Sequence, residues 1–215
     1  MSTSHRQGWC VIPLLCLLAS GAALAKDKSG RLDKGLLDPD WFGPNIQFLT
    51  TEEIDYLWVK PGFSIKGRKI LIQSWLDPVL LDEDRDAKDS AKASELTELM
   101  PSRIRGALAA ALSGVAQVSR EEGDTVLTGR IVDCNAGSKA AKFLVGMGAG
   151  SATATWDIKI TDKESGQLLA AIHHRSISGS SMSEIDDKVA KWLEEFGQAL
   201  HGDLAVAASG KPAKK

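Results

Sequence analysis

The chain has 215 residues, of which 43% are hydrophobic and 25% are charged, and both fractions are close to the averages of globular proteins. A chain of this length can bury a core large enough to fold without disulfide bonds. The formal net charge is only −2, so charge gives no reason to expect a nucleic-acid partner.

Residues 1–25 have the three parts of a secretion signal. His5 and Arg6 form a short basic region, residues 9–19 are almost wholly apolar, and residues 23–25 (ALA) form a small-x-small cleavage site. The apolar core is shorter than the roughly 20 residues that a membrane-spanning helix needs. We therefore expect export, with cleavage before Lys26 and no transmembrane span in the mature chain.

Cys16 raises the alternative of a lipid-modified N-terminus. Lipoprotein processing needs a small residue before the cysteine, and Leu15 is large, which favours the ordinary signal peptide. Cleavage before Lys26 removes Cys10 and Cys16 and leaves Cys134 alone. The mature chain then has no pair of cysteines for an internal disulfide, and we predict a buried or idle thiol.

The chain divides into four expected parts. They are a signal peptide (1–25), an extended N-terminal segment (26–53), a single α/β domain (54–208) and a disordered basic tail (209–215). Within the second part, residues 36–44 (LLDPDWFGP) read as a loop because of their prolines and glycine, with Trp41 and Phe42 available as anchors.

In the first half of the domain, the pattern predicts one main strand and one helix. Residues 56–59 form a short extended run, and residues 69–75 (KILIQSW) form the strand. Residues 82–95 carry six acids and three bases and read as a solvated connection. A helix follows over residues 95–112, with a kink or a true start at Pro101. Its apolar face is predicted to hold Leu96, Leu99, Met100, Ile104, Leu108 and Leu112.

The second half predicts three strands and a final helix. Residues 125–133 form a strand, and residues 151–162 alternate polar and apolar side chains, as in a strand buried on one face. A turn at residues 163–166 leads to the hairpin partner over residues 167–177. Ser183 is predicted to cap the final helix, whose buried face should hold Ile185, Val189, Leu193, Phe196 and Leu200.

These elements predict an α/β fold of the two-layer, α+β-like sandwich type. The expected order is β-α-β-β-β-α, with a mixed sheet of about four to five strands and the helices on one face.

Three motifs that resemble chemical sites fail on spacing or geometry. Residues 146–150 (GMGAG) miss the spacing of a dinucleotide loop and precede a strand instead of a helix. His173 and His174 point to opposite faces of a predicted strand, as a half-exposed pair that cannot easily share a metal ion. The serine-rich residues 176–183 lack a G-x-S-x-G elbow. We predict no catalytic residue, no metal ion and no cofactor.

The segment at residues 135–151 (NAGSKAAKFLVGMGAGS) is the candidate interaction surface. It joins two strands and combines two lysines with an apolar patch in a run of small residues. One reading is a short helix packed on the sheet edge; the other is a contact for a second subunit, an envelope protein or a lipid surface. The candidate residues are Lys139, Lys142, Phe143, Leu144, Val145, Gly146, Gly148 and Gly150.

Several stretches of the chain resemble domain-of-unknown-function family 4410. They are residues 127–133 (LTGRIVD), 136–141 (AGSKAA), 145–150 (VGMGAG) and the strand from Trp156 to Asp162. Residues 56–75 also resemble the opening of a related group of uncharacterised bacterial lipoproteins. The resemblance implies a Gram-negative envelope protein, with a fold similar to the small α/β domains of curli-secretion and TolB-like periplasmic proteins. It brings no catalytic residues.

We therefore expect a non-enzymatic module for binding or assembly in the periplasm or cell envelope. Its partner would be an envelope protein or a second copy, bound through residues 135–151. One alternative is a small-ligand or lipid carrier, which needs an enclosed apolar cavity. A second alternative is a hydrolase-type enzyme, which needs His173 or His174 beside an acid.

Overall fold

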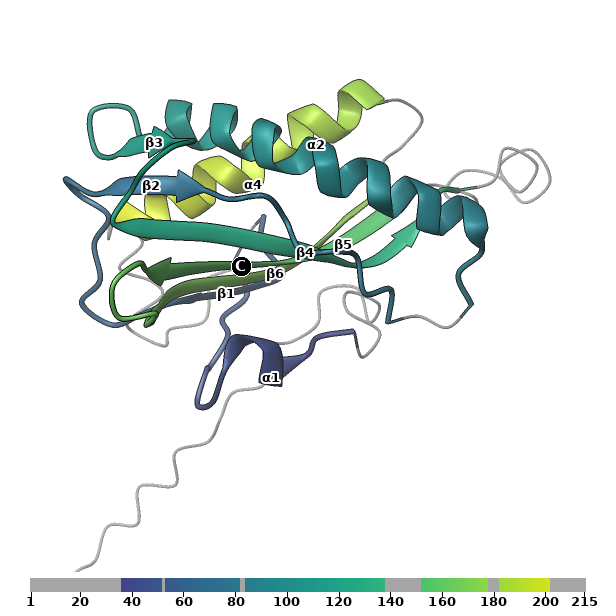
Figure 1. Ribbon diagram of the computed structural model, residues 1–215, viewed down its shortest axis with the longest axis horizontal. Coiled ribbons are helices and arrows are strands. Elements are labelled where there is room, and N and C mark those ends of the chain that lie inside the picture. The colour runs from purple at the N-terminus through teal and green to yellow at the C-terminus, as the bar shows by residue number, and fades with distance from the viewer. Residues whose placement is uncertain (1–35, 52, 82–83, 138–151, 178–181, 202–215) are drawn as a thin grey trace, which may run out of the picture.

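A computed structural model of the chain describes residues 36–51, 53–81, 84–137, 152–177 and 182–201. Figure 1 shows a twisted sheet with two long helices on one face and a short helix on the other. In chain order the elements are α1 (Pro39–Phe42), β1 (Tyr56–Val59), β2 (Lys69–Ile72), α2 (Ala87–Ala111), β3 (Gln117–Ser119), β4 (Thr125–Asn135), β5 (Thr153–Asp162), β6 (Leu168–Ile177) and α4 (Met182–His201).

The sheet has six strands in the order β1-β6-β5-β4-β2-β3. The neighbours along β1-β6-β5-β4 pair antiparallel, whereas β2 pairs parallel with both β4 and β3. The helix α2 connects β2 to β3, which is the crossover that two parallel neighbours require.

The predicted mixed α/β class is confirmed, but the strand count and order differ in detail. The sheet has six strands instead of four to five, because residues 56–59 pair with β6 and the three-residue β3 pairs with β2. The predicted loop at residues 36–44 contains α1, which Asp38 caps by accepting a hydrogen bond from the Trp41 amide. Short elements of three or four residues are too brief for periodicity to reveal.

The helix α2 begins eight residues before its predicted start. Asp86 is its N-cap, and the Asp86 and Asp89 side chains each accept a hydrogen bond from the other's backbone amide. This capping box starts a helix within the charged stretch that read as a solvated connection. The helix also continues through Pro101, so that residue is not its start.

One apolar core lies between the sheet and the two long helices. The predicted face of α2 is buried at Leu96, Met100, Ile104, Leu108 and Leu112, whereas Leu99 is half-buried. From α4, the core receives Trp192, Leu193, Phe196, Ala199 and Leu200. The helix α4 begins at Met182, so Ser183 lies inside the helix and is not its N-cap.

The strand β5 is buried on both faces, and the expectation of one buried face was wrong. Its apolar residues face the core, but Thr155 and Asp157 on the other face are also fully buried. The cover is the N-terminal segment, residues 36–51, which lies on the face opposite the two long helices (Figure 1). This second face carries most of the buried polar groups described below.

Within the described ranges, no helix is both long and apolar enough to cross a membrane. The predicted signal peptide and basic tail lie outside these ranges, as do Ile185 and Val189 as side chains.

Candidate functional site

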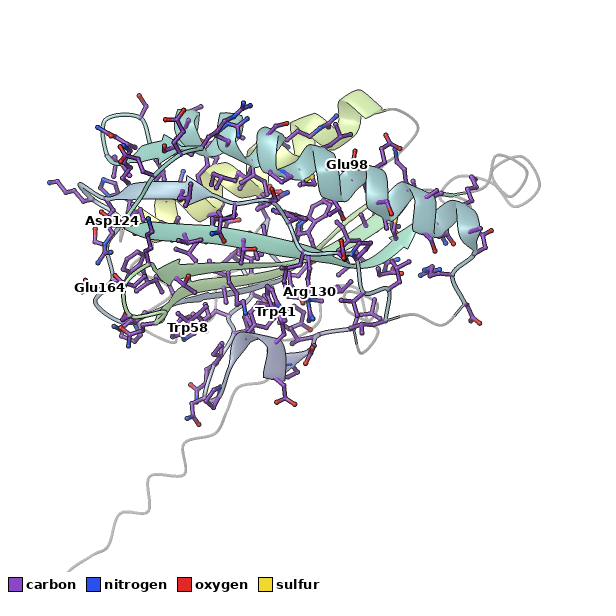
Figure 2. The ribbon with its side chains drawn as sticks, viewed as in Figure 1. Trp41, Trp58, Glu98, Asp124, Arg130 and Glu164 are labelled. Carbon is purple, nitrogen blue, oxygen red and sulfur yellow. The ribbon has the colours of Figure 1, made fainter. Side chains whose placement is uncertain are left out.

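A row of polar and aromatic side chains crosses four strands on the sheet face that the N-terminal segment covers. Tyr56 of β1 lies opposite His173 of β6, which lies opposite Asp157 of β5, which lies opposite Arg130 of β4. Directly opposed residues share a face of an antiparallel sheet, so these side chains are neighbours. Figure 2 shows Arg130 beneath the strands, beside Trp41 of α1.

The centre of this row is a buried charged network. The Asp157 carboxylate is fully buried and accepts a hydrogen bond from Arg130 Nε at 2.9 Å, with the Arg130 terminal nitrogen 2.7 Å away. On its other side, His173 Nδ1 lies 2.7 Å from Asp157 Oδ1, within hydrogen-bonding distance. The second ring nitrogen, His173 Nε2, is buried without a hydrogen-bond partner among the described residues.

The N-terminal segment completes the network from outside the sheet. Asp38 Oδ2 accepts a hydrogen bond from Arg130 at 3.0 Å. The Trp41 ring contacts two cations, with the Arg130 guanidinium carbon 4.4 Å and the Lys159 ammonium 4.0 Å from its centroid. Lys159 also donates to the Trp41 carbonyl at 3.0 Å. We call these six residues the Arg130 cluster: Asp38, Trp41, Arg130, Asp157, Lys159 and His173.

The charges of the cluster perturb one another. The hydrogen bond from Arg130 is the main reason that the pKa of Asp38 is lowered. Burial lowers the pKa of Lys159, and the nearby Arg130 charge acts in the same direction. The cluster therefore holds one face of the sheet and the N-terminal segment together through charged groups that are partly or fully removed from water.

The second histidine lies on the opposite face, against the core. His174 Nδ1 is 3.1 Å from Asp55 Oδ2, within ion-pairing distance but not aligned as a hydrogen bond. Its Nε2 is 3.3 Å from Ser176 Oγ. The rings of Trp156 and Trp192 lie 6.1 Å and 5.6 Å from the imidazole. The prediction that the two histidines face opposite ways is confirmed, but both are buried instead of half-exposed.

A small apolar hollow adjoins Ser176. Its volume is about 30 Å³, and its walls include Leu96, Cys134, Trp156 and Ser176. This volume is close to the share of one water molecule and far below the roughly 300 Å³ of the smallest ligand pockets. Cys134 is buried, which confirms the prediction of a buried thiol, and this burial raises the pKa of the thiol to about 12.

A larger groove, of about 400 Å³, opens at the turn between β5 and β6. It is polar, and its polar groups largely contact one another. Lys60 donates to Gln167 at 2.5 Å, and Arg68 donates to Asp162 at 3.3 Å. Ser165 donates to Asp162 from both its amide and its hydroxyl, and these bonds lower the pKa of Asp162 to about 2.

Exposed apolar side chains lie on the segment that follows β2 and runs along β4. The segment at residues 76–81, which we call the edge segment, follows β2 and donates amide hydrogen bonds to carbonyl groups of β4 at Gly129, Ile131 and Val132. Leu76, Val79 and Leu81 are 49%, 47% and 38% exposed. They are three of the four large hydrophobic residues that are exposed in the described chain; the fourth is Ile177.

The predicted interaction surface lies almost wholly outside the described residues. Lys139, Lys142, Phe143, Leu144, Val145, Gly146, Gly148 and Gly150 all belong to the range 138–151. Only its first residues are described, and they are held by α2: Asp89 accepts from the Ala136 amide at 2.7 Å, and Lys88 donates to the Gly137 carbonyl at 2.7 Å. No group of three potential metal ligands occurs in the described ranges.

The model of one protein family matches residues 61–180, which is more than half of the chain. That family is described as a domain of unknown function, DUF4410. The chain belongs to the DUF4410 family. This confirms the family that the sequence resembles. The matched range contains four members of the Arg130 cluster but not Asp38 or Trp41; the four are Arg130, Asp157, Lys159 and His173.

The DUF4410 assignment brings no activity, and no curated protein matches the chain. Among solved structures, a PelC dodecamer from Paraburkholderia phytofirmans is 12% identical, with a TM-score of 0.41, over 64% of this chain and 93% of that one. Protein XCC0632 from Xanthomonas campestris is also 12% identical, with a TM-score of 0.36, over 70% of this chain and 90% of that one. Similarity at this level carries no functional information.

Proposed function

We propose that the mature protein is a non-enzymatic binding or assembly module of a bacterial cell envelope and that it contacts a protein partner through the edge segment. The observation that carries this proposal is the concentration of exposed apolar side chains at Leu76, Val79 and Leu81. Contiguous exposed apolar side chains mark interaction sites more often than isolated ones.

The backbone of the edge segment explains why these side chains remain exposed. Pro78 and the positive φ of Leu80 (47°) prevent regular strand pairing. The amides of Leu76, Val79 and Leu81 nevertheless bond to β4 at 2.9 Å, which holds the segment in place. An ordered segment can present its apolar side chains to a partner without first losing conformational entropy.

The charge around the edge segment favours a basic partner surface. Asp77 is exposed between Leu76 and Val79. Apolar side chains flanked by lysine or arginine would complement this surface. Leu81 bonds to Val132, three residues before Asn135, so a partner seated here would also be near the start of the candidate surface at residues 135–151.

A photo-crosslinking residue at Val79, introduced into the full chain in cells, tests the proposal. The matched control places the same residue at Glu98, which is exposed on α2. We expect a discrete adduct from position 79 and none from position 98, with loss of the adduct in the Leu76→Ser, Leu81→Ser double variant. The proposal fails if position 79 gives no adduct or the same adducts as position 98. The same probe at Lys139, Lys142 and Phe143 tests the contact through residues 135–151.

Export is a separate part of the proposal and is tested on the protein itself. The protein isolated from a periplasmic fraction should begin at Lys26 by intact mass. A chain that still begins at Met1 and fractionates with cytosolic markers contradicts the assigned compartment.

A hydrolase is the second candidate, because Asp55, His174 and Ser176 are placed like the orienting acid, the base and the nucleophile of a serine hydrolase. Against it, Ser176 is buried beside a hollow of about 30 Å³. Labelling with a fluorophosphonate decides between the two candidates: label on Ser176 that is lost in Ser176→Ala supports the enzyme, and no label supports the binding module. The same hollow is too small for the lipid that a carrier would hold.

A further inference from the structure

The N-terminal segment is held to the sheet mainly by its side chains. Asp38 bonds to Arg130, and the Trp41 ring contacts Arg130 and Lys159. Phe42 is buried against Phe48 of the same segment, and the Phe48 ring lies 6.2 Å from that of Tyr56 on β1. Among the described residues, the first backbone hydrogen bonds from this segment to the sheet occur at Leu49, which pairs with Leu57. Residues 36–44 therefore sit on the sheet face as a bound peptide would.

The sheet face contacts residues 36–44 through two basic side chains. Arg130 supplies a guanidinium that bonds to a carboxylate of the segment, and Arg130 and Lys159 together supply two cations that contact one indole ring. Lys159 adds a hydrogen bond to the carbonyl of the same tryptophan. The matching pattern is an aspartate followed three residues later by a tryptophan, because one helical turn places both on the same side.

Two residues of positive φ follow α1. Gly43 has a φ of 107° and Asn45 a φ of 64°, on either side of Pro44. Gly43 has a conformation open chiefly to glycine, and the φ of Asn45 lies in the left-handed region, which Asn adopts more readily than most residues. Rotation at these two positions would move residues 36–42 and leave the pairing of Leu49 with Leu57 in place.

We infer that the face around Arg130 and Lys159 is a recognition site for residues 36–44 and that it accepts them from a second copy of the chain as well as from its own. The contacts involve only the Asp38 carboxylate, the Trp41 ring and the Trp41 carbonyl, so they are the same whether the segment belongs to one copy or the other. A second copy is the partner that carries the complete matching sequence, LLDPDWFGP. Exchange of an identical element is a low-cost route to assembly. This inference does not depend on the edge segment.

The test mixes two forms of the full mature chain. One is unlabelled and carries a photo-crosslinking residue at Asp40, which is exposed on α1; the other is fully ¹⁵N-labelled and carries no probe. After equilibration and irradiation, mass spectrometry identifies whether the probe is joined to β4–β6 peptides of its own isotope or of the other. The control places the probe at Glu98, which Figure 2 shows on α2, on the far side of the sheet from Trp41.

We expect mixed-isotope crosslinks from position 40 whose yield rises with protein concentration, and none from position 98. The Trp41→Ala change in the probe-bearing chain removes two cation–π contacts and should lower the mixed yield about tenfold. A labelled LLDPDWFGP peptide should bind the Trp41→Ala chain more tightly than the parent chain, whose face is occupied. Crosslinks confined to one isotope at every concentration, or a mixed yield unchanged by Trp41→Ala in a chain that keeps its circular dichroism spectrum, would overturn the inference.

Discussion

Replacement of Arg130 by methionine should be among the most destabilising single changes in this protein. The Arg130 side chain is 8% exposed, and Asp157 is 0% exposed. Without Arg130, the Asp157 carboxylate keeps only His173 as a close polar partner among the contacts described. Breaking a buried ion pair by removing one partner costs about 3–5 kcal/mol, which is a large part of the roughly 5–15 kcal/mol that stabilises a typical domain. For a domain of about 150 residues, this lowers the melting temperature by about 6–20 °C.

Arg68→Met is the matched control. Arg68 also pairs with a strand carboxylate, Asp162, at 3.3 Å, but the two side chains are 32% and 25% exposed. Water screens such a pair, so we expect a loss of about 1 kcal/mol or less. Urea unfolding of the mature chain, followed by tryptophan fluorescence and circular dichroism, measures both variants.

The double variant Arg130→Met, Asp157→Leu separates the cost of the unpaired Asp157 charge from the cost of losing the Arg130 side chain itself. If the cost comes from the unpaired Asp157 charge, removal of that charge as well should restore much of the stability. Equal losses of unfolding free energy for Arg130→Met and Arg68→Met would refute the assignment of Arg130 and Asp157 as a buried pair. A double variant that is less stable than Arg130→Met by about another 3–5 kcal/mol would refute it as well.

Three further predictions follow from particular contacts. A Cβ at Gly129 would lie 2.7 Å from the Trp75 ring and 2.9 Å from the Asp157 carbonyl oxygen, so Gly129→Ala should cost about 1–3 kcal/mol, whereas Gly106→Ala, with open space around it, should add up to about 1 kcal/mol in urea unfolding. Cys134, with a pKa of about 12, is about 10⁻⁴ thiolate at pH 8, so it should resist Ellman's reagent when folded and react after unfolding; rapid labelling of the folded chain contradicts its burial. Asp162 should titrate near pH 2 by NMR, so its contribution to stability is present above the ordinary value of 3.8 and is lost as pH falls through about 2; Ser165→Ala should raise this pKa, and no change would contradict the assigned hydrogen bonds.

The sequence predicts those parts of the fold in which periodicity extends over ten residues or more. The alternation over residues 151–162 and the turn at residues 163–166 predict β5 and its hairpin with β6, and three- and four-residue steps predict the buried face of α2. The early start of α2 was also readable, because Asp86 and Asp89 have the spacing of a capping box, although the surrounding charges suggested a solvated stretch. The charges are compatible with a helix whose one face is exposed.

The Arg130 cluster could not be predicted, because no spacing along the chain connects its members. Asp38 and Trp41 belong to the N-terminal segment, and Arg130, Asp157 and His173 lie on three different strands. The alternation of β5 correctly separates Asp157 from the core, but it does not say that another segment covers that face. Burial on the second face depends on residues 36–51, which read as extended or loop because α1 has only four residues.

A single β-bulge decides which histidine meets Asp157. The hairpin turn pairs Thr161 with Leu168, and an unbroken register from that pair would place Asp157 opposite Ile172 and would put His174 on the same face as Asp157. The irregularity between Ile160 and Thr161 shifts the register by one residue, so that Asp157 lies opposite His173. Because a shift of one residue exchanges the two faces of a strand, it also turns His174 toward Trp156 and the core. The charged network on one face and the aromatic contacts of His174 on the other therefore depend on the same extra residue in β6.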